Sequence, residues 1–253
     1  MGELITYERH MDDYGIIRLN RPEKRNAISM EMTALLKDKI QKAEKDNLKF
    51  LIITGAGNTM FAAGGDLSEL HGELSSEEAY FRLFPMMEVL ESILYFPVPV
   101  IAKLNGNALG GGCELATACD IRIAKENTKF GYIQSTIGIL PGWGGGALLY
   151  EKVQPSFALD WITRGDVLSV QELKDRGWIH QIIEEESWED EKYLSPYIEK
   201  SAQQMRLLKA QYRAVIQPEE LRRRMVEEVK ASASLWESEA HKKALENFSL
   251  RKK

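Results

Sequence analysis

Three consecutive glycines, Gly110, Gly111 and Gly112, stand two residues before the carboxylate of Glu114. An apolar run at residues 98–104 precedes them and predicts a buried strand. Glycines at a strand end let the backbone approach a ligand closely, and the amides of a following helix start are unpaired and lie at the positive end of its dipole. Such amides can hold negative charge on an oxygen. The segment therefore predicts a site for a developing oxyanion, faced by Glu114.

A second junction of the same kind lies upstream, where Gly64 and Gly65 follow the β-like run at residues 50–54 and the short run at 60–62. A single glycine-rich turn followed by a glutamate is explained by a tight turn and a first-turn carboxylate that stabilises a helix. Two junctions offer two amide donors, which is what an oxyanion site needs. The pair therefore favours the functional interpretation over two unrelated turns.

These segments resemble the two signature segments of the crotonase, or enoyl-CoA hydratase/isomerase, superfamily: residues 61–67 read FAAGGDL and residues 105–115 read NGNALGGGCEL. Five further matches follow the order of that family. They are LNRP at 19–22 with NAI at 26–28, CDI at 119–121, LPGWGG at 140–145, TRGD at 163–166 and GWI at 177–179. The resemblance covers almost the whole chain. It implies a spiral ββα fold, a homotrimer or homohexamer, and an acyl-CoA substrate.

The resemblance also implies roles for single residues. The amides of Gly65 and Gly111 match the two oxyanion-hole positions that bind a thioester carbonyl, and Glu114 matches the first catalytic glutamate. A coenzyme A site, occupied by the substrate and not by a permanently bound cofactor, is implied at Lys24, Arg25, Ala27, Ala63, Asp66 and Leu67. Ala63 and Asp66 match positions near the adenine, and Lys24 with Arg25 matches cations near the phosphates. These two cations are equally well explained as exposed loop charges.

The chain departs from the family pattern at the second catalytic glutamate, where residues 130–134 read FGYIQ and Gln134 stands in place of the acid. A neutral amide cannot donate and recover a proton, although it can hold water or a thioester by hydrogen bonds. We expect enoyl-CoA hydratase as the family's commonest activity, with Glu114 as the acid or base. Gln134 leaves open an enoyl-CoA isomerase or an alkylmalonyl-CoA decarboxylase, in which one titratable group suffices.

The PGWGG segment that contains Trp143 is similar to a segment of ethylmalonyl-CoA decarboxylase-like members, but Trp143 is better explained as a core aromatic, because large aromatic side chains usually pack in the core. A non-catalytic CoA-binding scaffold is the alternative from a different class, and the intact Glu114 argues against it. RNA binding, a third possibility, lacks a basic groove to support it.

The composition is that of a globular protein of 253 residues, with 44% hydrophobic and 28% charged residues and a net charge of -5. The acidic balance argues against general nucleic-acid binding. No signal segment or apolar run long enough to cross a bilayer is seen, so we expect no membrane association and a cytoplasmic or organelle-matrix enzyme, with cytoplasm as the prediction. Cys113 and Cys119 are consistent with reduced buried thiols, although spacing leaves a disulfide open, and the four dispersed histidines predict no metal site.

Alternating strand and helix patterns up to residue 155 predict an α/β core with parallel strands, including a helix near residues 29–43. From residue 156 the pattern becomes nearly all helix. We therefore expect a spiral α/β CoA-binding core at residues 1–155 and a helical C-terminal unit at 156–253 that takes part in subunit contacts. The basic run at residues 222–224 is flanked by glutamates at 219, 220, 227 and 228, which predicts a solvated, ion-paired face.

Overall fold

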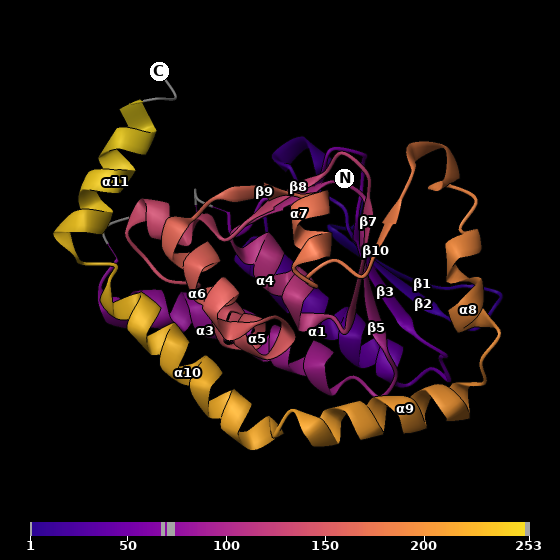
Figure 1. Ribbon diagram of the computed structural model, residues 1–253. Helices are drawn as coiled ribbons and strands as arrows, with labels where there is room; N and C mark the ends of the chain where they lie inside the picture. Colours follow the sequence, from indigo (N-terminus) through magenta and orange to yellow (C-terminus); the bar gives the residue numbers. More distant parts are fainter. Residues whose placement is uncertain (1, 67–68, 70–73, 251–253) are drawn as a thin grey trace.

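The computed structural model describes residues 2–66, 69 and 74–250, with the side chains of 247–250 left aside. Two sheets organise the chain (Figure 1). The larger has the strand order β1-β2-β3-β5-β7-β10 and the smaller the order β4-β6-β8-β9. The strands of the first are β1 (Ile5–Arg9), β2 (Gly15–Leu19), β3 (Leu51–Gly55), β5 (Val100–Leu104), β7 (Ile121–Lys125) and β10 (Gln181–Ile183); those of the second are β4 (Met60–Ala62), β6 (Asn107–Leu109), β8 (Lys129–Gly131) and β9 (Val167–Ser169).

Strand direction is mostly parallel, as the alternating sequence pattern predicts. In the larger sheet β2, β3, β5, β7 and β10 run parallel, and only the edge hairpin β1-β2 is antiparallel. In the smaller sheet β4, β6 and β8 are parallel and β9 is antiparallel to β8. Every residue of β3 is buried, which is why its sequence is an apolar run without alternation.

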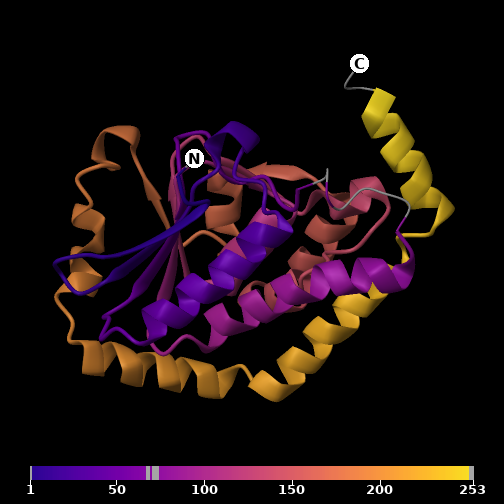
Figure 2. The ribbon, with the colours of Figure 1, turned by 180° about the vertical axis from the view of Figure 1, so that it is seen from behind.

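The first two long helices begin at serine caps. In α1 (Met30–Glu44) the Ser29 side chain accepts from the amide of Met32, and in α3 (Ser76–Tyr95) Ser75 and Glu78 form a capping box. Figure 2 shows α1 and α3 side by side, with α1 next to the strands of the larger sheet, and Leu36 of α1 and Leu90 of α3 are fully buried. The predicted helix near 29–43 is therefore present.

The other α-helices that the structure describes either begin at a glycine junction or lie in the C-terminal part of the chain. They are α4 (Gly111–Ala118), α5 (Gly145–Lys152), α6 (Pro155–Arg164), α7 (Val170–Asp175), α8 (Ser195–Ile198), α9 (Ala202–Val215), α10 (Pro218–Ser234) and α11 (Glu239–Leu250). Helix α10 packs on α3 and α5. Figure 1 shows α9 and α10 along one edge of the molecule and α11 projecting beside the C-terminus.

The expectation that the chain is nearly all helix from residue 156 is wrong in one respect. β9 joins the smaller sheet beside β8, and β10 closes one edge of the larger sheet beside β7. Both strands are three residues long, too short for a period to be visible in the sequence. The pairs β7–β10 and β8–β9 join strands from the two sides of residue 155. The division of the chain at that residue stays a prediction. In the described part of the chain no helix is long and apolar enough to span a membrane.

Candidate active site

The two glycine junctions meet because the strands that lead into them are neighbours. β4 pairs in parallel with β6, so Gly64 and Gly65, after β4, lie beside the junction that opens α4 after β6. Gly64 has a φ of +96°, and a Cβ built on it would lie 3.0 Å from the carbonyl oxygen of Leu109 and 3.1 Å from the nitrogen of Gly111. Only glycine satisfies both the conformation and the close approach.

The amides of Gly65 and Gly111 are left for another partner by this arrangement. Gly65 forms a parallel bridge with Ile28 that uses the carbonyl of Gly64 and the amide of Asp66. Gly111 is the first residue of α4, where helix amides lack an acceptor one turn earlier. Both residues line one cavity of about 90 Å³. The predicted oxyanion donors are thus brought together, and their role remains a proposal.

The indole of Trp143 leaves no room for a side chain at position 111. A Cβ at Gly111 would lie 2.2 Å from Cζ3 of the Trp143 indole, so the ring occupies the space that an alanine methyl would need. Trp143 is 5% exposed and lines the same cavity. The tryptophan that the sequence left between a core and a pocket role has both.

Glu114 is held by four hydrogen-bond donors. Its Oε2 accepts from the amides of Trp143 at 2.8 Å and Gly145 at 2.9 Å. Its Oε1 accepts from Nε2 of Gln134 at 2.8 Å and from the amide of Gly142 at 3.2 Å. A carboxylate offers about four acceptor positions, so its capacity is filled by these four partners. The contact with the Gly142 amide is the longest of the four, so a hydrogen-bond donor of the substrate or a water molecule would replace it most easily.

Burial dominates the proton affinity of Glu114. The side chain is 1% exposed, and this loss of solvation raises the pKa of Glu114, while the amides of Trp143, Gly145 and Gly142 and the Gln134 side chain oppose the rise. A carboxyl group whose pKa is raised toward neutral pH can both accept and return a proton.

Gln134 lines the cavity beside Glu114. It lies on the 3₁₀ segment Ile133–Ile137 and is buried, and its Nε2 must face Glu114, since an ionised carboxylate can only accept. No described residue donates to Oε1 of Gln134. This oxygen can hold a water molecule or a substrate hydroxyl, but it cannot supply a proton.

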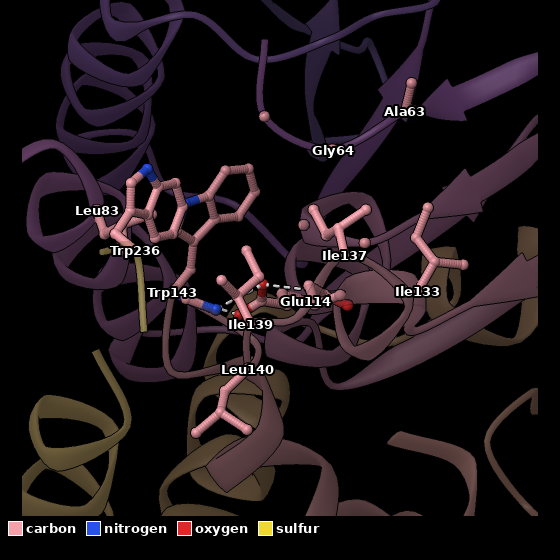
Figure 3. Close-up of a pocket in the computed structure, with 15 residues that line it drawn as sticks. Ala63, Gly64, Leu83, Glu114, Ile133, Ile137, Ile139, Leu140, Trp143 and Trp236 are labelled. Carbon is pink, nitrogen blue, oxygen red and sulfur yellow. Dashed lines mark hydrogen bonds between the residues drawn. The ribbon is translucent and has the colours of Figure 1, made fainter. Parts of the chain in front are cut away.

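The rest of the cavity is apolar. Figure 3 shows Leu83, Trp143 and Trp236 on one side of Glu114 and Ile133 and Ile137 on the other. Ile139 and Leu140 complete this lining. Among the described residues that line the cavity, Glu114 carries the one titratable side chain. The cavity therefore suits an apolar acyl group with its reacting carbon near a single carboxylate.

The predicted coenzyme A residues lie on two adjoining segments. The amide of Ala63 donates to the carbonyl of Arg25, and the amide of Asp66 donates to that of Ile28. Lys24 and Arg25 are exposed, while Ala27 is partly buried. The Asp66 carboxylate pairs with Arg21 at 2.6 Å, so its negative charge is balanced within the protein. Leu67 lies outside the described residues.

Sequence reasoning missed a second carboxylate beside Glu114. Glu228, on α10, accepts from the amides of Gly146 at 3.0 Å and Ala147 at 2.6 Å. Glu228 therefore points inward, which corrects the expectation that all the glutamates at residues 219–228 are solvated. On the exposed side of the same helix, Arg223 does pair with Glu220 and Glu227. The only signal in the sequence was the glycine run at 144–146, which gives carboxylates access to the backbone.

Two other groups singled out in the sequence lie outside the cavity. Cys113 and Cys119 are buried and free, so no disulfide joins them. The described residues contain no cluster of three or more His, Cys, Asp or Glu side chains arranged to hold a metal ion.

Comparison with known proteins identifies relatives of this arrangement. The model of the enoyl-CoA hydratase/isomerase family matches residues 13–253. The chain is 35% identical over 177 residues to crotonyl-CoA hydratase of Syntrophomonas wolfei, covering 68% of this chain and 66% of the relative. It is 35% identical over 175 residues to short-chain-enoyl-CoA hydratase of Clostridium acetobutylicum, covering 67% of this chain and 65% of the relative. The matched segment thus spans slightly less than two thirds of either relative.

A solved structure supports the fold over nearly the full length. The crystal structure of enoyl-CoA hydratase from Bacillus halodurans superposes with a TM-score of 0.88, covering 97% of this chain and 100% of that chain at 24% identity. At this identity the likeness concerns the fold and not the reaction.

Proposed function

The chain belongs to the enoyl-CoA hydratase/isomerase family, and on that premise we propose that it is an enzyme that stabilises the enolate of an acyl-CoA thioester. The observation that supports this most is the position of Glu114 in the same cavity as the amides of Gly65 and Gly111. The predicted membership of the crotonase superfamily and its mixed α/β fold are confirmed.

In the proposed reaction the thioester oxygen lies between the amides of Gly65 and Gly111. As the carbonyl becomes an enolate, each preorganised donor in a dry site contributes about a hundred- to a thousandfold in rate. The acyl chain lies along the apolar wall formed by Trp143, Trp236 and Leu83. Coenzyme A enters as part of the substrate, with Lys24 and Arg25 near its phosphates, and no permanently bound cofactor is needed for these steps.

We assign hydration of an enoyl-CoA as the activity, following the relatives named crotonyl-CoA hydratase and short-chain-enoyl-CoA hydratase. Gln134 Oε1 holds the water, and Glu114 takes its proton and returns one to the α-carbon, so one carboxyl group serves both steps. Glu114 must release one of its four donors to do so, and the Gly142 amide at 3.2 Å is the weakest of them.

Isomerisation of an enoyl-CoA or decarboxylation of an alkylmalonyl-CoA is the second candidate. Both reactions are favoured by the neutral Gln134. The apolar lining further favours decarboxylation, because a substrate carboxylate placed in such a cavity is poorly solvated and its loss as carbon dioxide is eased. Either reaction needs one titratable group, whereas hydration usually draws on two.

The test is turnover of crotonyl-CoA by the wild-type protein and by Gln134→Glu, with products identified by mass, beside carbon dioxide release from methylmalonyl- and ethylmalonyl-CoA. Hydration by the wild type supports the first assignment. Hydration only by Gln134→Glu transfers the assignment to the second candidate. A wild-type protein that binds these thioesters but hydrates and decarboxylates none of them, and shifts no double bond of a 3-enoyl-CoA, would refute the enzymatic proposal in favour of a CoA-binding scaffold.

We also propose a homotrimer or homohexamer in the cytoplasm. Leu207, Leu208 and Val215 leave an apolar strip exposed on α9, with Val215 77% exposed, and such a strip is typical of a subunit contact. Light scattering after size-exclusion chromatography tests the assembly, and a monomer at micromolar concentration would contradict it.

A further inference from the structure

Five backbone amides within residues 142–147 are divided between two carboxylates at the start of α5. The amides of Gly142, Trp143 and Gly145 donate to Glu114. Those of Gly146 and Ala147 donate to Glu228. Because the Gly145 amide on Glu114 is followed directly by the Gly146 amide on Glu228, a shift of either carboxylate moves backbone that holds the other.

The glycines in this segment are required by the close approach of both acids. A Cβ at Gly145 would lie 2.3 Å from Cβ of Glu114, and one at Gly146 would lie 2.5 Å from Oε2 of Glu228. A side chain at Gly145 would overlap the Cβ of Glu114, and one at Gly146 would displace the carboxylate of Glu228. The segment is therefore fitted to both carboxylates and not only to the one in the cavity.

Glu228 is itself fixed by the docking of α10. This helix packs on α3 and α5, and its Arg224 pairs with Glu151 of α5. One turn beyond Glu228, the hydroxyl of Ser232 donates to the carbonyl oxygen of Leu140 at 2.9 Å, just before the amide segment. Helix α10 thus holds the segment at two points.

We propose that Glu228 is a positioning residue for the acid–base group: by binding the amides of Gly146 and Ala147 it keeps those of Trp143 and Gly145 on Glu114. The inference rests on the proposed function only in that Glu114 is the acid–base group assigned there. Glu228 is not among the residues that line the cavity, and it acts through the backbone.

The two acids also interact through their charge. Burial, followed by the charge of Glu114, raises the pKa of Glu228 well above its usual range. The other titratable groups that face the pair are Tyr132 near the end of β8, Cys113 of α4 and Tyr150 of α5, and burial raises the pKa of each. These three are neutral at ordinary pH, so the charge that raises the pKa of Glu228 is that of Glu114. Two coupled acids lose their protons in two steps that belong to the pair.

The test compares Glu228→Gln with Glu227→Gln, which removes a neighbouring carboxylate that faces solvent and Arg223. Glutamine offers one acceptor oxygen and places an NH₂ group against the remaining amide. With crotonyl-CoA, or whichever thioester the wild type converts, we expect kcat of Glu228→Gln to fall by about tenfold to a hundredfold, as small misplacements of catalytic groups do, with little change in KM. Glu227→Gln should behave as wild type.

A readout independent of turnover is the ¹³C carboxyl titration of Glu114, assigned from the signal lost in Glu114→Gln. We expect two steps in the wild type and in Glu227→Gln, and one in Glu228→Gln. Glu228→Asp, which restores the charge, should recover the second step and part of kcat, and it replaces Glu228→Gln as the decisive variant if the latter does not fold.

The inference is overturned if Glu114 titrates identically in the wild type and Glu228→Gln, or if kcat is unchanged in that variant. If Glu228→Asp must stand alone, wild-type kcat together with an unshifted Glu114 titration overturns it. A wild-type protein without activity toward any acyl-CoA, combined with a changed Glu114 titration in Glu228→Gln, would overturn the proposed function and support the coupling of the two acids.

Discussion

Replacing Glu114 by glutamine and by alanine should separate its chemical role from its structural one. Glutamine can place its oxygen where Oε2 accepts from Trp143 and Gly145, and its NH₂ group can donate to Gln134 after the Gln134 amide turns over. Only the amide of Gly142 then loses its acceptor. One buried unsatisfied donor costs about 1–3 kcal/mol, which is the expected loss in the free energy of unfolding.

Alanine removes the acceptors of all three backbone amides and of Gln134. At about 1 kcal/mol or more for each buried amide, the expected loss is at least about 3 kcal/mol, so Glu114→Ala should be clearly less stable than Glu114→Gln. Both variants lack the acid–base group, and kcat should fall by about a hundred- to ten-thousandfold in each.

Urea unfolding at pH 7, followed by tryptophan fluorescence, measures the difference in stability, and loss of the conjugated thioester absorbance of crotonyl-CoA measures turnover. Equal stability of the alanine and glutamine variants would show that Glu114 does not hold the amide segment. A glutamine variant with more than a tenth of the wild-type kcat would show that Glu114 is not the acid–base group.

Three further changes test the site and its support. Gly111→Ala would place a methyl 2.2 Å from the Trp143 ring; displacement of the ring should cost about 1–3 kcal/mol and kcat/KM should fall by about a hundredfold, measured by melting and turnover. Burial lowers the pKa of Lys152 from 10.5 to about 8. Below pH 8 the side chain is charged in both the folded and the unfolded protein, so the folded state carries the full cost of burying the charge. Above pH 10.5 the side chain is neutral in both states and this cost is absent. Lys152→Met should therefore gain up to about 3 kcal/mol at pH 7 and lose this advantage as pH rises through that window, and a gain independent of pH would contradict the reasoning. Asp120→Asn leaves the buried ammonium of Lys209 without its carboxylate partner and should cost about 3–5 kcal/mol in urea unfolding; a loss under 1 kcal/mol would show that solvent reaches Lys209.

The parts of the site carried by short ordered segments could be predicted from the sequence. Gly65, Gly111, Glu114 and Gln134 each lie within a few residues of a glycine junction or a family motif, and the structure brings all four to one cavity. Their local geometry follows from where the strands end, which apolar runs already indicate.

Glu228 could not be predicted because its environment depends on long-range docking. It follows Glu227 on a highly charged helix, and only the packing of α10 on α5 turns one of these two glutamates inward and leaves the other on Arg223. The contact of Trp143 with Gly111 is equally remote in sequence, since an indole can fill a core or a pocket with the same local pattern.

The contact between Trp143 and Gly111 links two properties that an enzyme would otherwise vary separately. The indole lines the cavity assigned to the acyl chain, and the same ring contacts the residue whose amide is assigned to the thioester oxygen. A smaller side chain at position 143 would admit a bulkier acyl group and at the same time loosen the backbone beneath it. Broadening the substrate range along this wall therefore entails slower chemistry, unless a second change restores support to Gly111.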